Sequence, residues 1–143
     1  MTRVLEVGET VVERTFEVDP AGMQLLTAIL RDPNPIHYDR EYATQRGYPG
    51  RVNQGPINAE YVAQAALEVA ESPAGLRSLD VQYEDFVFES ETVTAIGTVA
   101  DMDRSDATVE LVLELRADDG TVAVTGQAVV DVDQDWLPVA SGN

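Results

Sequence analysis

Apolar and polar positions alternate in the second half of the chain, where the residues are rich in Val, Thr, Phe and Tyr. This period of two is typical of strands. It predicts four of them, over Leu79–Glu89, Thr92–Met102, Thr108–Arg116 and Thr121–Val132. Asp119-Gly120, between the last two, is a strong hairpin signal, and we expect the four strands to form a meander. An earlier alternation predicts one further strand over Val11–Val18.

Helical spacing replaces this alternation between the first predicted strand and residue 71. A helix is predicted over Pro20–Leu30, because Asp19 is a good N-cap and proline suits the first helical position. A short helix is predicted over Glu41–Arg46. The longest helical pattern, Pro56–Glu71, is rich in alanine on all sides, which is typical of a buried helix.

One buried helix followed by a run of strands predicts an α+β fold, in which a single antiparallel sheet is wrapped around the helix. The 143 residues suit a single domain over 1–143. We expect a flexible tail from about residue 136, since the last residues, LPVASGN, carry no regular pattern.

Composition narrows the classes of function. The chain has 26 acidic and 9 basic residues and a formal net charge of -17, which argues against nucleic-acid or anionic-membrane partners. All nine basic residues are arginine, so Schiff-base chemistry on lysine is excluded. The absence of cysteine excludes thiolate nucleophiles and cysteine-ligated metals. With no secretory signal and no apolar stretch of about 20 residues, a cytoplasmic protein is expected.

Candidate chemistry gathers in one proline-rich segment. His37, the only histidine, follows Asp32 by five residues, and Pro33, Asn34 and Pro35 lie between them. An imidazole beside a carboxylate supplies an acid and a base near neutral pH, and the prolines stiffen the loop that carries them. A purely structural hydrogen-bonding role for the histidine is the alternative. A metal site is less well supported, because one imidazole is a poor match to usual zinc sites.

The segment DPNPIHYD at residues 32–39, together with Gly55 before the longest predicted helix, resembles the MaoC-like (R)-specific enoyl-CoA hydratases. Their signature is a D-x-N-P-[IV]-H-x-D loop followed by a glycine at the start of the central helix. The resemblance covers essentially the whole chain. It implies a hot-dog fold, with an antiparallel β-sheet wrapped around a long central α-helix.

The resemblance also implies roles for individual residues. Asp32 and His37 match the catalytic dyad that activates water for addition to the double bond of a trans-2-enoyl thioester. Asn34 matches the residue that orients the dyad or the water. Gly55 matches the glycine whose N–H helps to form the oxyanion hole, and a helix N-terminus suits the negative charge that develops there.

Three further residues are candidates for substrate binding. Gln54 stands where the family usually has histidine, and it can form hydrogen bonds in the pocket but cannot titrate. Arg51 can meet a CoA phosphate, and Tyr48 can line an acyl channel. A surface role for Arg51 and a core role for Tyr48 are the alternatives.

The reaction implied is reversible hydration of trans-2-enoyl-CoA to (3R)-3-hydroxyacyl-CoA, a step of fatty acid metabolism. No metal or redox cofactor is expected, and CoA enters as part of the substrate. One alternative is a hot-dog acyl-CoA thioesterase, for which Glu60 on the predicted helix keeps a carboxylate available. Another is the catalytic subunit of a heteromeric hydroxyacyl-thioester dehydratase. A homodimer is expected, or a heteromer with a second hot-dog chain, because a lone sheet leaves edge strands unpaired.

Overall fold

The computed structural model describes residues 4–32 and 34–139. The elements in chain order are β1 (Thr10–Glu17), α1 (Pro20–Leu30), the 3₁₀ turn η1 (Pro35–His37), α2 (Arg40–Gln45), α3 (Gly55–Val69), β2 (Leu76–Tyr83), β3 (Thr92–Asp103), β4 (Thr108–Ala117), β5 (Val122–Asp131) and the 3₁₀ turn η2 (Gln134–Trp136).

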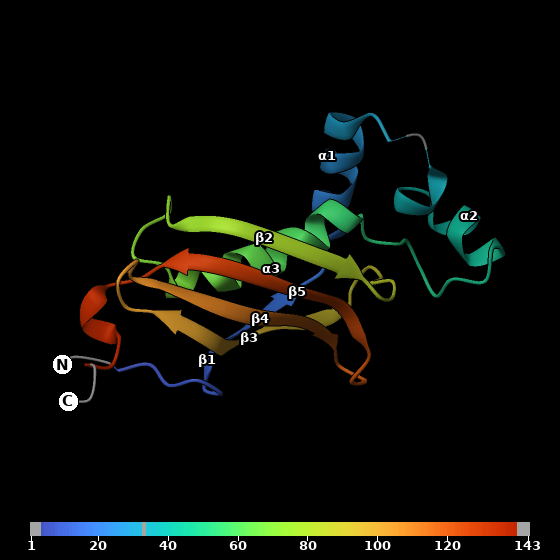
Figure 1. Cartoon of the computed structure of the whole chain (residues 1–143). Coiled ribbons are helices and arrows are strands. Elements are labelled where there is room, and N and C mark those ends of the chain that lie inside the picture. The colour runs from blue at the N-terminus through green and yellow to red at the C-terminus, as the bar shows by residue number, and fades with distance from the viewer. Residues whose placement is uncertain (1–3, 33, 140–143) are drawn as a thin grey trace.

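A five-stranded antiparallel sheet with strand order β1-β3-β4-β5-β2 packs against α3 (Figure 1). Buried and partly exposed residues alternate along β3 and β4, because successive side chains of a strand point to opposite faces of the sheet. The buried face meets α3, whose small side chains allow close packing. The buried residues of α3 are Asn58, Tyr61, Val62, Ala65, Ala66 and Val69.

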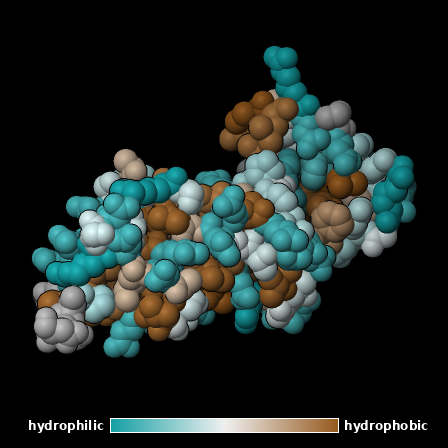
Figure 2. Space-filling model, viewed as in Figure 1, coloured by the Kyte–Doolittle hydropathy of each residue, from teal (hydrophilic) through white to brown (hydrophobic). Residues whose placement is uncertain are grey.

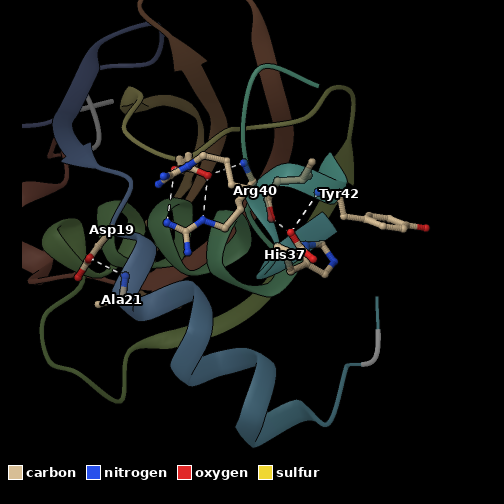
Figure 3. A network of polar contacts seen from close by, with 9 residues as sticks. Asp19, Ala21, His37, Arg40 and Tyr42 are labelled. Carbon is tan, nitrogen blue, oxygen red and sulfur yellow. Dashed lines mark hydrogen bonds and ion pairs between the residues drawn. The ribbon is translucent and has the colours of Figure 1, made fainter. Parts of the chain in front are cut away.

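Residues 19–54, here called the excursion, connect β1 to α3 and include α1, η1 and α2. They lie at one end of the sheet, away from the chain termini (Figure 1). Asp19 caps α1 by accepting a hydrogen bond from the Ala21 N–H at 2.9 Å, and Asp39 caps α2 through the Tyr42 N–H at 3.1 Å (Figure 3). The apolar side chains exposed on α1 form part of the projecting brown surface in Figure 2.

The predicted fold class is confirmed: a single sheet and one central helix form a hot-dog fold. The central helix is the longest among the described residues, although its 15 residues make only about four turns. The other predicted helices and β3 to β5 lie within one or two residues of their expected bounds.

The predicted strand Leu79–Glu89 is confirmed as far as Tyr83 and wrong beyond it, and the predicted meander of four strands holds for β3, β4 and β5 but not for β2. β2 ends at Tyr83, because the N–H groups of Glu84 and Asp85 both donate to the Ala123 carbonyl and turn the chain away from the sheet. β2 lies at the sheet edge beside β5, not next to β3. The apolar residues beyond the turn pack on the excursion instead, and Phe86 contacts the Tyr48 ring at 5.5 Å.

The predicted flexible tail is wrong for its first residues. Leu137 is 2% exposed and belongs to the hydrophobic core, and the Trp136 carbonyl accepts a 2.7 Å hydrogen bond from the Leu5 N–H. Arg104 donates to the carbonyls of Leu137 and Pro138. These contacts tie the segment to the sheet as far as residue 138, and residues 140–143 lie outside the described residues.

Candidate active site

The predicted dyad forms in the excursion. His37 Nε2 lies 3.3 Å from Asp32 Oδ2, and the two side chains are 13% and 30% exposed. Asp32 reaches this position because α1 ends at Arg31 in the left-handed conformation, with φ 53°. The Asp32 N–H then donates to the Thr27 carbonyl at 3.1 Å, which holds the carboxylate close to the end of the helix.

The second imidazole nitrogen fixes the orientation of His37. Nδ1 lies 2.7 Å from the Val52 carbonyl oxygen, which can only accept a hydrogen bond. A neutral His37 therefore carries its proton on Nδ1, and the Nε2 lone pair faces Asp32 and the pocket. The dyad has one nitrogen held by the main chain and one available for proton transfer.

Asn34 shapes the loop between the two members of the dyad. Its N–H donates to Asp32 Oδ1 at 3.0 Å, and its own side-chain oxygen accepts from the Ile36 N–H at 3.3 Å and caps η1. Its side chain thus acts on the turn that carries His37. A direct contact of Asn34 with water or substrate stays a prediction.

His37 and Gly55 share a pocket of about 290 Å³. Its wall combines the loop after β2 with the start of α3, and it is lined by His37, Val52, Asn53, Gly55, Asn58, Tyr83, Glu84, Asp85 and Phe86. Asp32 is not among the lining residues, but its carboxylate contacts His37, which is one of them. Phe86 and Tyr83 are about half exposed at the mouth.

Gly55 begins α3, where helix N–H groups have no partner within the helix. Pro56 follows and has no N–H, so Gly55 supplies the donor at this point of the helix. A Cβ at Gly55 would lie 3.1 Å from the Tyr83 ring, so a side chain there would crowd the pocket. The helix dipole favours negative charge at the same place.

The sequence matches the family described as MaoC like domain over residues 4–120, which is most of the chain. The chain belongs to the MaoC-like domain family. Among curated proteins, no relative matches the sequence.

Solved structures share the fold of this MaoC-like domain. The unliganded R-hydratase PhaJ1 from Pseudomonas aeruginosa matches with TM-score 0.79 and 21% identity, over 90% of this chain and 84% of its own. The (R)-hydratase from A. caviae involved in PHA biosynthesis matches with TM-score 0.79 and 22% identity, over 90% and 98%. The ChsH1–ChsH2 complex from Mycobacterium tuberculosis matches with TM-score 0.76 and 20% identity, over 91% and 100%.

The three predicted substrate-binding residues lie outside the pocket lining of the MaoC-like domain. Gln54 is 1% exposed and points into the excursion, where its Nε2 donates to the Met23 carbonyl at 3.0 Å and to Thr27 Oγ1 at 2.7 Å. Because Thr27 also accepts from the Asp32 N–H, Gln54 links the start of α3 to the dyad. A role in shaping the pocket by direct contact does not fit this placement.

Arg51 is bound to Glu89, with Nε 2.8 Å from the carboxylate and its side chain 11% exposed. Because its guanidinium is bound to Glu89, Arg51 is not free in the single chain for the expected contact with a CoA phosphate. Tyr48 packs on Phe86 and Phe88 with ring centroids at 5.5 and 6.0 Å, so it supports the pocket mouth from behind. Tyr48 is partly buried and lies outside the hydrophobic core, so the core role that was the alternative does not describe it either.

Sequence reasoning missed two carboxamides of the pocket. Asn53 and Asn58 are each 3% exposed, and Asn53 Nδ2 donates to Asn58 Oδ1 at 2.7 Å. A signal for Asn58 was present, because it follows Gly55 by three residues and so shares a helix face with it. Glu60, in contrast, is exposed and accepts from Gln64 Nε2 at 3.1 Å.

Within residues 4–32 and 34–139, no group of three His, Cys, Asp or Glu side chains is placed to hold a metal ion. In the same part of the chain, no helix is long and apolar enough to cross a membrane.

Proposed function

We propose that the protein catalyses the (R)-specific hydration of a short trans-2-enoyl-CoA to the (3R)-3-hydroxyacyl-CoA, or the reverse dehydration. The observation that carries the proposal is the 3.3 Å contact between His37 Nε2 and Asp32 Oδ2, with His37 and Gly55 lining one pocket. Membership of the MaoC-like domain family supports a hydratase or dehydratase.

In the proposed reaction, the dyad of Asp32 and His37 takes a proton from water as the water oxygen bonds to C3 of the enoyl group. The C2–C3 π electrons move toward the thioester oxygen and give an enolate. The dyad then delivers a proton to C2, and the thioester carbonyl re-forms. The net change is addition of H to C2 and OH to C3, so no oxidant or reductant is needed.

The Gly55 N–H is the proposed donor to the enolate oxygen. Charge develops there only as the reaction proceeds, so a donor fixed in advance stabilises the transition state more than the substrate. Removal of one such donor costs about 3–4 kcal/mol of barrier in other enzymes.

The proposed acyl group is short. The carboxamides of Asn53 and Asn58 lie in the pocket wall next to His37 and Gly55. The buried Asn53 Oδ1 has no hydrogen-bond partner among the described residues, and a long alkyl chain packed against this wall would leave it beside apolar surface, which is unfavourable.

We further propose that the protein works as a dimer, either with itself or with a second hot-dog chain. β2 is an edge strand with unpaired main-chain groups, and its last residue, Tyr83, lines the pocket. Pairing along β2 would therefore bring the second chain close to the pocket mouth. A solution mass of two chains for the purified protein tests the homodimer.

The reaction is tested with crotonyl-CoA, by following the enoyl absorbance and free thiol together. We expect the enoyl absorbance to fall without thiol release, and the product to be (3R)-3-hydroxybutyryl-CoA by chiral analysis. Thiol release with the enoyl group intact would instead establish the thioesterase. The exposed position of Glu60 argues against that outcome.

A further inference from the structure

Glu89, in the loop between β2 and β3, is a carboxylate enclosed by two arginines. Its side chain is 8% exposed. It accepts hydrogen bonds from Arg40 Nε and from Arg51 Nε, both at 2.8 Å, and from the Arg51 main-chain N–H at 2.5 Å. Figure 3 labels Arg40 of this cluster together with His37, which comes from the same stretch of chain.

The carboxylate is ionised and closely fitted to its site. Burial alone would raise the pKa of Glu89, but the hydrogen bonds from Arg40 and Arg51 and the charge of Arg51 outweigh it and hold the pKa at about 2. A Cβ at Gly50 would lie 2.9 Å from Glu89 Cγ. Glu89 can therefore approach the main chain here because residue 50 has no side chain.

Main-chain hydrogen bonds connect this carboxylate to His37. The Arg51 N–H donates to Glu89, and the Arg51 carbonyl accepts from the Glu89 N–H at 2.9 Å, so Arg51 is held on both sides. Val52 follows directly. Its N–H donates to the Ile36 carbonyl at 2.8 Å, and its carbonyl meets His37 Nδ1 at 2.7 Å.

Arg40 connects the same carboxylate to the other side of the dyad loop. It is the first residue of α2, three residues after His37, and its side chain is 62% exposed. Glu89 thus holds Arg51, which precedes the Val52 carbonyl that is hydrogen-bonded to His37 Nδ1. It also holds α2, the helix that follows His37.

We propose that Glu89 is a positioning residue for His37: through Arg51 and Arg40 it fixes the Val52 carbonyl, and with it the orientation and tautomer of the imidazole. The effect on turnover rests on the proposed hydratase function. The effect on the imidazole does not, so the two can be tested separately.

A merely stabilising ion pair provides the matched control. Asp131 accepts from Arg77 Nε at 2.6 Å, and the pair joins residues of β5 and β2 that do not line the pocket of His37 and Gly55. Asp131→Asn and Glu89→Gln each neutralise one carboxylate that binds arginine. Only Glu89→Gln is expected to change the imidazole.

The direct experiment is ¹⁵N NMR of the imidazole in the full chain. His37 is the only histidine, so its ring signals need no assignment among others. We expect the neutral ring in the wild type and in Asp131→Asn to hold its proton on Nδ1. In Glu89→Gln we expect a mixture with the Nε2–H form, because the Val52 carbonyl is no longer held in place.

Turnover of crotonyl-CoA gives the second readout. We expect kcat of Glu89→Gln to fall by about 10- to 100-fold with KM within about threefold, because misplacing a reacting group mainly weakens transition-state stabilisation. If the wild type proves inactive on enoyl-CoA, the proposed function fails, and the tautomer alone decides the role of Glu89.

Arg40→Ala covers the case in which Glu89→Gln does not fold. It removes one exposed arginine from the cluster and leaves Glu89 and Arg51 paired, so a smaller change of the imidazole signals in the same direction is expected. Imidazole signals identical to those of the wild type in the folded Glu89→Gln variant, or in Arg40→Ala where the former does not fold, would overturn the proposal.

Discussion

The sheet with α3 and the excursion of residues 19–54 are held together in different ways. The sheet region contains almost the whole hydrophobic core, and within the described part of the excursion Met23 alone joins that core. The excursion depends instead on side-chain hydrogen bonds to the main chain, such as the caps by Asp19 and Asp39 and the contacts of buried Gln54. The candidate dyad of Asp32 and His37 lies in the region that the core stabilises least.

This difference has a functional reason. A dyad must lie at the surface of a pocket that substrate can enter, so its loop cannot be buried in an apolar core. Short polar contacts hold such a loop at defined positions without filling the pocket. The excursion is thus ordered by many directional contacts, and the sheet by apolar area.

Leu113→Ala tests the core side of the comparison. Leu113 is fully buried on β4, and its truncation is expected to lower the free energy of unfolding by about 2–5 kcal/mol. Chemical denaturation measures this. The neighbour Val112 points to the other face and is 43% exposed, so Val112→Ala should change stability by less than about 1 kcal/mol. Equal effects of the two truncations would contradict the assignment of the core.

Acid titration of stability tests the excursion side through Glu89. Its pKa is about 2 in the folded protein and ordinary, near 4.5, in the unfolded chain. A lowered folded-state pKa stabilises the fold above the unfolded pKa and loses this effect as pH falls from about 4.5 to about 2. We expect Glu89→Gln to be less stable than the wild type by on the order of 2 kcal/mol near neutral pH.

The same difference should shrink as the pH is lowered through this window, because both proteins then carry an uncharged side chain at residue 89. Denaturation curves at several pH values measure it. A difference that stays constant from neutral pH down to about 2 would show that the charge of Glu89 does not stabilise the folded chain.

The smallest effect is expected from the cap of α2. Asp39→Ala removes the acceptor of the Tyr42 N–H and should cost about 1 kcal/mol of stability. Asp39→Asn keeps an oxygen at the cap and should cost much less. A cost for the alanine variant no greater than for asparagine would mean that the cap does not stabilise the excursion.

The contrast between the sheet region and the excursion also decides what could be predicted from the sequence. Alternation of apolar residues predicted β3, β4 and β5, because one face of these strands is buried and the other is more exposed. The family signature predicted the pairing of Asp32 with His37, since five residues and a 3₁₀ turn bring them together. The sequence predicted a stiff loop here but not the 3₁₀ turn, which begins at Pro35.

Long-range polar pairing was not predictable. The partners of Glu89, Arg40 and Arg51, lie 49 and 38 residues away, and no local pattern joins them. The apolar residues Phe86 and Phe88 continued the strand pattern but pack on Tyr48. β2 pairs with β5 at the edge of the sheet, and no local pattern in the sequence indicates this pairing.

The central claim is that Asp32 and His37 act as one catalytic unit. Its most direct test is the kcat for crotonyl-CoA hydration of His37→Gln, Asp32→Asn and the double variant, with Asp39→Asn as a carboxylate control in the same loop. We expect each single variant to lose about 10²- to 10⁴-fold, and the double variant to lose no more than the worse single one. The control should keep wild-type activity. Hydration at wild-type rates by the double variant would contradict the account.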